Sequence, residues 1–419
     1  MQPLPTLPEW VSLEHQVAHI LQKQEEHGWY FDLGSARELE STLRRELRDI
    51  TQVLQDRFPF VPGAEFTPKR NNKTQGYVAG CTFQRLVDFN PSSRDHISWI
   101  LQTYDGWKPS VMTATGKPIV DEVTLKTHGT GLSLQFFRIL EITKSLGMIS
   151  EGANAWLKLC TNANRIHHHC SVATSTFRCA HRNPNLAQCP SGSEFRKLFT
   201  ASPKQVMVGA DLSGIELRML AHYLARYDSG RYADILLNGD IHQVNADKIG
   251  ISRKQVKTVT YAFLYGAGDQ KIGLSFDSQL KPSAAKKKGA EIREAYVSAI
   301  DGLSDLLTAV KSAGDRGFVR GIDGRKVLVD SPHKALNYLL QGSAAVIAKR
   351  WMVIANDNPF CCHQLAFIHD ELQYECAPEH ADDLKFYLEL SAVQSGEYYN
   401  LRLPLAAEGK IGATWADVH

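Results

Sequence analysis

Residues 206–218 of this 419-residue chain read VMVGADLSGIELR, and this stretch says most about the fold. A short apolar run of strand character ends in Asp211, and a helical pattern begins directly after it. A carboxylate at the end of a strand, followed by the backbone carbonyl of Leu212, is a good ligand pair for a hard cation. An aspartate in this place can equally be a simple helix cap, so the stretch alone leaves both interpretations open.

A second stretch, residues 253–266, reads RKQVKTVTYAFLYG. Arg253, Lys257, Tyr261 and Tyr265 are spaced four apart, so on a helix they drift slowly around one face. Cations pair with phosphate oxygens and aromatic rings stack on bases, so this face suits a ligand with phosphates at one end and a flat ring at the other. An amphipathic helix with a tyrosine-bearing core face remains the alternative.

A third stretch, residues 367–374, reads FIHDELQY, in which apolar residues flank a His-Asp-Glu triplet. The pattern predicts a hairpin with acids at its bend, although a polar turn without function would look the same. Asp370 lies far from Asp211 in sequence, so only the fold can bring the two together. Two carboxylates converging near phosphates would bind two Mg²⁺ ions about 4 Å apart, one activating the attacking hydroxyl and one stabilising the leaving oxygen.

The order and spacing of the three stretches favour the functional interpretation of each stretch over its alternative. Together they resemble motifs A, B and C of the family A DNA polymerases, the DNA polymerase I group, with the greatest similarity to the replicative polymerases of podovirus-type phages. The resemblance runs from about residue 12 to His419. Five further segments carry it: FNPSSR at 89–94, NPNLAQ at 183–188, GDIH at 239–242, GIDGRKV at 321–327 and SPHKALNYLLQ at 331–341.

The resemblance implies an α+β chain with the right-hand polymerase fold, in which an antiparallel palm sheet joins helical fingers and a helical thumb. The expected thumb is 1–150, and the first part of the palm, with motif A, is 151–235. The fingers with the motif B helix are expected at 236–333, and the second part of the palm, with motif C, at 334–419. The residues themselves predict two long helices over 11–58 and an extended loop over 58–89.

The resemblance also implies a template-directed enzyme that adds deoxynucleotides to a primer 3′ end. Asp211, Asp370 and the Leu212 carbonyl would hold two Mg²⁺ ions, for which Mn²⁺ would substitute. Glu371 would be an accessory acid near the primer terminus. Glu216 would block a ribose 2′-hydroxyl and so select deoxynucleotides.

The helix of the second stretch would bind the incoming nucleotide. Arg253, Lys257 and His242 would bind the triphosphate, and Lys257 could also protonate the leaving pyrophosphate. Tyr261 would lie against the sugar and base, and Tyr265 would stack on the template side. The remaining primer–template contacts implied by the resemblance are Arg94, Arg178, Gln188, Asn337, Gln341 and His369.

The chain departs from the family pattern in several places. The thumb-like helix begins near Leu13 and no Asp-x-Glu site precedes it, so we expect no intrinsic 3′→5′ exonuclease domain; the alternative is that the sequence is a fragment of a longer polymerase. A separate exonuclease chain and a replisome helicase–primase are therefore candidate partners. The loop at 58–89 is too short for the insertion that binds thioredoxin in a phage relative, so we expect no thioredoxin dependence. Its basic tip, Lys69-Arg70-Asn71-Asn72-Lys73, could contact phosphates.

Two features lie close to motif A. Thr176-Phe177-Arg178 stands where relatives have Thr-Gly-Arg, which weakens the assignment of Arg178 as a DNA contact. The histidines and cysteines between 167 and 189 are spaced too irregularly to predict a zinc site.

Composition sets the broad class of the protein. With 43% hydrophobic residues and a formal net charge of +2, the chain is neither disordered nor fibrous. We find no apolar run of the ~18 residues that a membrane helix needs, no leader pattern in the first five residues and no paired CxxC spacing. We therefore expect a soluble cytoplasmic protein, in the host cytoplasm if a phage encodes it.

Other classes of protein fit less well. A single-subunit RNA polymerase would have a small residue in place of Glu216. A catalytically inactive accessory subunit would be expected to lose Asp211, Lys257 or Asp370, and all three are present. A metal-dependent nuclease would not need the Arg-Lys-Tyr-Tyr helix.

Overall fold

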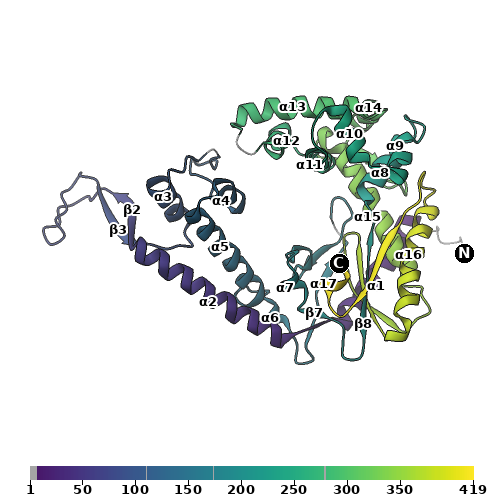
Figure 1. Cartoon of the computed structure of the whole chain (residues 1–419), viewed down its shortest axis with the longest axis horizontal. Helices are drawn as coiled ribbons and strands as arrows, with labels where there is room; N and C mark the ends of the chain where they lie inside the picture. The colour runs from purple at the N-terminus through teal and green to yellow at the C-terminus, as the bar shows by residue number, and fades with distance from the viewer. Residues whose placement is uncertain (1–6, 110, 173, 278–279) are drawn as a thin grey trace, which may run out of the picture. The chain divides into compact units, whose positions relative to one another are not determined.

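The computed structural model describes residues 7–109, 111–172, 174–277 and 280–419 (Figure 1). Contacts divide the chain into two units: Ala36–Lys158, and Met1–Ser35 together with Leu159–His419. Among the described residues, no helix has the length and apolarity to cross a membrane. The first five residues, on which the expectation of no leader rests, lie outside the described part.

The unit Ala36–Lys158 is mainly helical. Its core gathers apolar side chains from helices and from the strand ends, including Leu54, Phe89, Ile97 and Phe136. The range 58–89, expected as a loop, contains a two-stranded antiparallel hairpin. The elements of this unit are α2 (Leu33–Arg57), β2 (Phe60–Phe66), β3 (Phe83–Asp88), α3 (Arg94–Tyr104), α4 (Glu122–His128), α5 (Gly131–Leu146), η1 (Gly147–Glu151) and α6 (Trp156–Leu159).

The other unit is built on a four-stranded antiparallel sheet in the order β11-β12-β8-β13. The strands are β8 (Val206–Leu212), β11 (Cys362–Ile368), β12 (Glu371–Cys376) and β13 (Ala407–Gly412). Strand β8 pairs with β12 on one side and β13 on the other, and most of its side chains are buried, in agreement with its nearly continuous apolar run. Helix α16 (Ala381–Tyr398) packs on β8 and β13, and helix α15 (Ala335–Ala355) packs on α16.

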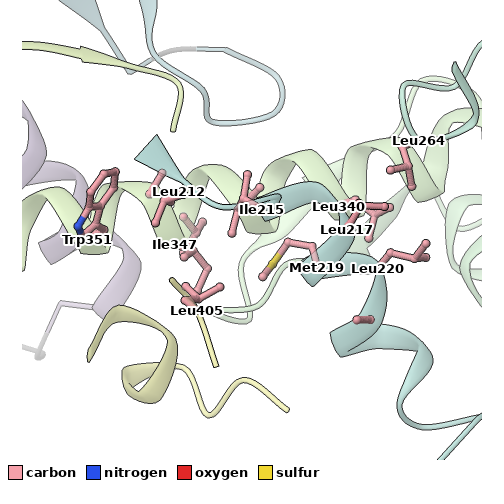
Figure 2. Close-up of a cluster of buried hydrophobic side chains, with 14 of the residues drawn as sticks. Leu212, Ile215, Leu217, Met219, Leu220, Leu264, Leu340, Ile347, Trp351 and Leu405 are labelled. Atoms are coloured by element: carbon pink, nitrogen blue, oxygen red, sulfur yellow. The ribbon is translucent and has the colours of Figure 1, made fainter. Parts of the chain in front are cut away.

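A single hydrophobic core runs from this sheet into the neighbouring helices. Leu212 at the end of β8 and Ile215 at the start of α8 (Ile215–Leu224) lie in the same cluster as Trp351 of α15 and Leu405 (Figure 2). Leu264, at the end of helix α11 (Arg253–Leu264), belongs to this cluster as well. The core therefore holds the motif A strand and the motif B helix in one packed body.

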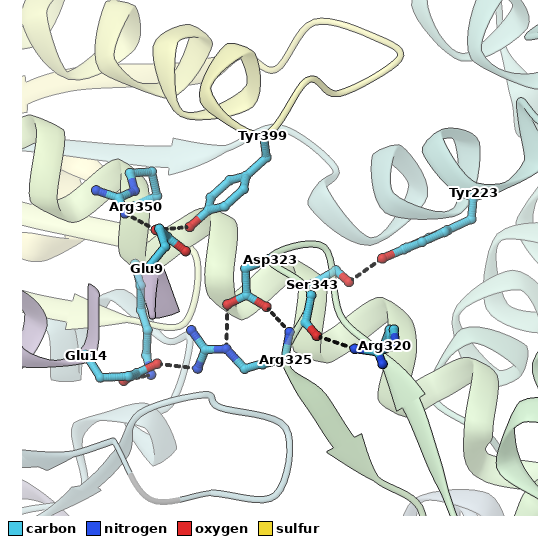
Figure 3. Close-up of polar contacts among 11 residues, drawn as sticks. Glu9, Glu14, Tyr223, Arg320, Asp323, Arg325, Ser343, Arg350 and Tyr399 are labelled. Carbon is cyan, nitrogen blue, oxygen red and sulfur yellow. Dashed lines mark hydrogen bonds and ion pairs between the residues drawn. The ribbon is translucent and has the colours of Figure 1, made fainter. Parts of the chain in front are cut away.

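Helix α1 (Glu9–His27) is held to this unit by ion pairs (Figure 3). Glu14 pairs with Arg325 and with Lys349, each at 2.6 Å. Glu9 pairs with Arg350 and accepts a hydrogen bond from Tyr399. Helix α1 therefore belongs with residues 159–419, which does not coincide with the expected thumb range 1–150. The domain assignments stay predictions.

The remaining elements of this unit connect the sheet to a helical layer. The backbones of helices α12 and α13 approach closely because Gly289 has no side chain. A Cβ atom at this position would clash with the Asp269 carbonyl. The elements are β1 (Trp29–Phe31), β4 (Arg165–Ile166), β5 (His169–Ser171), β6 (Ala180–Arg182), η2 (Leu186–Gln188), α7 (Ser193–Arg196), β7 (Phe199–Thr200), α9 (Arg231–Asn238), α10 (Ile241–Ile249), α12 (Asp269–Phe276), α13 (Pro282–Ala299), α14 (Leu303–Gly314), β9 (Phe318–Arg320), β10 (Lys326–Leu328), η3 (Pro332–Lys334), η4 (Pro378–His380) and α17 (Trp415–Val418).

Candidate active site

The sheet brings the two motif aspartates together. Asp211 lies near the end of β8, and Asp370 lies in the two-residue turn between β11 and β12. The register places Glu371 directly opposite Asp211, and the Leu212 N–H donates to the Asp370 carbonyl at 3.0 Å. Two acids that are far apart in sequence thus share one corner of the sheet, as the third stretch required.

The local charge at this corner is strongly negative. Burial, and then the Asp211 carboxylate, raise the pKa of Asp370 from 3.8 to about 7. Burial and the nearby Glu371 raise the pKa of Asp211 to about 6. Carboxylates that resist ionisation side by side are a favourable place for divalent cations, whose charge relieves the repulsion. The oxygen donors at this corner therefore fit hard metal ions.

Glu371 is turned into the protein rather than toward solvent. It is buried and accepts hydrogen bonds from Trp415 at 2.6 Å and from Gln373 at 2.5 Å. Its other oxygen lies 3.1 Å from a ring nitrogen of His419, the last residue. The sequence analysis missed Trp415 and His419, because no local pattern ties the C-terminal segment to the motif C hairpin.

Glu216 links motif A to motif B. It lies in the first turn of α8, and its Oε1 atom accepts hydrogen bonds from Arg178 at 2.9 Å and from the Tyr265 hydroxyl at 2.8 Å. Burial and the charge of Glu216 raise the pKa of Tyr265 to about 12. Both Glu216 and Arg178 affect the pKa of Asp370, so these side chains border the metal corner.

Helix α11 presents its cations at one end and its tyrosines at the other. Ser252 and Gln255 form a capping box at its start, which fixes where the helix begins. Arg253 pairs with Asp240 at 2.6 Å, and Lys257 is exposed, with no ion pair among the residues that the structure describes. A cation with no such partner is available to a phosphate.

His242 and Tyr261 complete this surface. Burial, and then the charge of Arg253, lower the pKa of His242, and its ring centroid lies 6.3 Å from that of Tyr261. Burial and the carboxylates of Glu216 and Asp370 raise the pKa of Tyr261. Tyr261 therefore lies between the cationic end of α11 and the aspartate corner.

The residues expected to contact DNA lie in several different elements of the structure. Asn337 donates to the Leu264 carbonyl at 2.8 Å and so joins α15 to the end of α11. His369 precedes Asp370 with a left-handed φ of 62°. Gln341 in α15 is half-buried, and Gln188 in η2 is exposed. Arg94, the first residue of α3, belongs to the other unit, which is described by itself.

Comparison with known proteins agrees with this geometry. A family model described as "DNA polymerase family A" matches residues 69–417. The DNA-directed DNA polymerase of Enterobacteria phage T3 is 33% identical over 98% of this chain and 70% of its own length. That of Escherichia phage T7 is 32% identical with the same coverage. The POL domain of Pol1 from M. smegmatis, in complex with DNA primer-template and dNTP, superposes with a TM-score of 0.76 at 21% identity, over 97% of this chain and 70% of that one.

The chain therefore belongs to family A of the DNA polymerases, which confirms the predicted family and fold class. It is a DNA-directed DNA polymerase, a nucleotidyltransferase similar to those of T3 and T7 phages. Enzymes of this family use divalent metal ions and deoxynucleoside triphosphates.

Proposed function

We propose that this polymerase extends a primer by a two-metal-ion mechanism in which Asp211 and Asp370 hold two Mg²⁺ ions, with Mn²⁺ able to substitute. The observation that carries the proposal is the strand register that brings Asp211 and Asp370 to one corner of the sheet, where burial and neighbouring carboxylates raise both pKa values. The Leu212 carbonyl is the expected third ligand. Metal ions bound there would activate the primer 3′-hydroxyl and offset charge on the leaving pyrophosphate.

The side chains around this corner bind different parts of the incoming nucleotide. Arg253, Lys257 and His242 bind the triphosphate, and Lys257 is placed to give a proton to the pyrophosphate as it leaves. Arg253 must exchange its partner Asp240 for a phosphate, since the two are paired at 2.6 Å. Tyr261 packs against the sugar and base of the incoming nucleotide.

Glu216 selects deoxynucleotides in this proposal. Its carboxylate is buried and already accepts two hydrogen bonds, from Arg178 and Tyr265, so it is held in one position. A ribose 2′-hydroxyl approaching that position meets a fixed side chain instead of water. Tyr265 must leave Glu216 to stack on the template side, so its hydroxyl bond is expected to break when the nucleotide site fills.

Primer–template DNA is the second substrate. The M. smegmatis Pol1 domain, which shares the fold, was solved with DNA primer-template and dNTP. We assign primer–template contacts to Arg178, His369, Asn337, Gln341 and Gln188, with Arg94 and Glu371 as further participants. We also assign residues 1–150 to the thumb, 236–333 to the fingers, and 151–235 and 334–419 to the palm.

Primer extension tests the proposal directly. The wild type should extend a primed single strand with Mg²⁺ and deoxynucleotides, while Asp211→Ala and Asp370→Ala should lose at least about 10³-fold in rate. Asp357→Ala, which removes a carboxylate after α15, is the matched control and should retain activity. Full extension by either aspartate variant would contradict the metal assignment.

Two further comparisons refine the result. Glu216→Ala should raise ribonucleotide incorporation relative to wild type, whereas Glu141→Ala, in the other unit, should not. We also propose that these 419 residues carry no 3′→5′ exonuclease activity, since no Asp-x-Glu site precedes the first helix. Shortening of the primer when nucleotides are withheld would refute that part alone.

A further inference from the structure

Three potential metal ligands converge away from the aspartate corner. His168, Cys170 and His181 each offer one ligand atom, and these atoms lie within 4.8 Å of one another. All three side chains are buried, with His168 at 0%, Cys170 at 8% and His181 at 7% exposure. Because these residues are irregularly spaced, the sequence did not predict the cluster.

Strand geometry explains the convergence. Side chains alternate between the two faces of an extended chain, so His168 and Cys170 point to the same side. His181 lies directly opposite Cys170 in the antiparallel pair β5–β6, and paired residues share a face. The flanking His167 and His169 point the other way, where their ring nitrogens lie 2.7 Å from the backbone oxygen and a carboxylate oxygen of Glu25, respectively.

Three distances in the cluster are close to those of a four-coordinate metal site. The Cys170 Sγ atom lies 3.1 Å from His181 Nδ1. The Gln24 amide closes the remaining side, with its terminal nitrogen 3.1 Å from His168 Nε2 and 3.6 Å from Cys170 Sγ. With Zn–N bonds of ~2.0–2.1 Å and Zn–S of ~2.3 Å, the edges of a tetrahedron are roughly 3.3–3.6 Å. The Cys170–His181 distance and both Gln24 distances are close to such an edge, and the three ligand atoms lie within 4.8 Å of one another, within reach of one ion.

The geometry points to a structural transition-metal site of the Zn²⁺ type, held by His168, Cys170 and His181 with Gln24 at the fourth corner. An amide oxygen and nitrogen occupy nearly the same positions when the group rotates by 180°, so rotation turns Gln24 from a donor into an oxygen ligand. That rotation gives up the hydrogen bond that Gln24 accepts from Gln364 at 2.8 Å.

The protonation states suit metal binding. Burial lowers the pKa of His168 to about 3 and that of His181 to about 4, so both rings are neutral, which is the form that binds a metal. Burial raises the pKa of the Cys170 thiol, so its proton must leave as the sulfur binds the ion. The thiolate and two neutral imidazoles leave one positive charge on a Zn²⁺ complex, and the nearby Glu25 carboxylate, which acts on Cys170 electrostatically, offsets it.

The site would hold three elements together, and one of them lies near the motif C turn. It joins α1, through Gln24, to β5 and β6. The ring of His181 also lies 6.1 Å from that of His369, the residue before Asp370. The site is separate from the catalytic metals, and the inference does not depend on the roles proposed for Asp211 and Asp370.

Cobalt spectroscopy on the tag-free 419-residue chain tests the inference. Co²⁺ is added to chelator-treated protein in excess Mg²⁺, in an Asp211→Asn, Asp370→Asn background that removes the other carboxylate site. A tetrahedral site with one thiolate should give one Co²⁺ per chain, a sulfur-to-cobalt charge-transfer band and intense visible bands. One equivalent of Zn²⁺ should remove them. Absence of the charge-transfer band at saturating Co²⁺ would overturn the inference without any cluster variant.

Ligand variants provide the second measurement. Cys170→Ser and His181→Asn should each lower bound Zn²⁺ after dialysis from about one per chain to about one tenth or less. Cys376→Ser, which changes a fully buried thiol in β12 of the four-stranded sheet, and His222→Asn, which changes a buried histidine of α8, are the matched controls and should keep the metal. Far-UV circular dichroism checks that each variant is folded. Equal zinc content in folded Cys170→Ser and wild type would refute the assignment.

Discussion

Replacing Asp370 by asparagine should stabilise the metal-free protein while abolishing catalysis. The pKa of Asp370 rises from 3.8 to about 7 on folding, chiefly through burial and then through Asp211. A carboxyl group with a raised native pKa contributes stability that is fully present below about pH 4 and is lost as pH rises through about 7. Asparagine cannot ionise, so the variant escapes this loss.

The magnitude follows from the shift. A change of about 3 pKa units corresponds to about 4 kcal/mol at pH 8 as an upper bound. Asp370 is partly exposed and shares its charge repulsion with Asp211, so we expect about 1–2 kcal/mol. At pH 5, where the native carboxyl is mostly protonated, the gain should be less than half as large.

Urea unfolding in EDTA at pH 5 and pH 8, followed by tryptophan fluorescence and circular dichroism, measures the effect. Asp323→Asn is the matched control of opposite sign, because the Asp323 carboxylate is buried and paired with Arg325 at 2.5 Å. Removing it should destabilise the protein at both pH values. Mg²⁺ should stabilise the wild type at pH 8 far more than Asp370→Asn. A variant no more stable than wild type at pH 8, or one with an equal gain at pH 5, would refute the charge-repulsion argument.

Three further predictions concern single side chains. Family members with tyrosine at the Tyr261 position accept dideoxynucleotides readily, and we expect Tyr261→Phe to lower their incorporation about 10- to 100-fold relative to deoxynucleotides, measured by single-turnover kinetics. Equal ratios in both proteins would count against it. Phe177 has a left-handed φ of 63° beneath the Arg325 guanidinium, so Phe177→Ala should be less stable than Phe177→Gly by about 1 kcal/mol in chemical denaturation, because only alanine keeps the backbone strain; the opposite order would refute this. Gly289→Ala should cost more than about 2 kcal/mol by forcing α13 away from the Asp269 carbonyl, whereas Gly268→Ala, with open space around it, should cost less than about 1 kcal/mol; similar losses in thermal melts would contradict the close packing.

Phe177 departs from the family pattern, and the structure shows the backbone conformation and packing of this residue. The sequence places a phenylalanine where relatives have glycine, and glycine is the residue that tolerates a left-handed backbone. The structure has Phe177 in a left-handed conformation and packs its ring under Arg325, at 4.6 Å from the guanidinium carbon. The next residue, Arg178, donates a hydrogen bond to Glu216 at 2.9 Å.

The sequence by itself determined the local elements and the order of the chemistry. The apolar run of β8, the capping box and the four-residue spacing of α11, and the acids at the β11–β12 bend all follow from short-range periodicity, which a linear sequence displays directly. The resemblance of these stretches to motifs A, B and C identified the family before any contact was known. The hairpin within 58–89 was missed, because its edge strands lack a continuous apolar face and turn residues dominate the segment.

Only the tertiary structure decided which distant side chains meet. The pairing of β8 with β12 sets Asp211 beside the motif C turn, and it turns Glu371 toward His419 and Trp415. Helix α1 proved to be fastened to α15, and His181 proved to face Cys170 across β5 and β6. Such contacts depend on strand register and helix packing over hundreds of residues, and the spacing of residues along a chain carries no information about which strand will lie next to which.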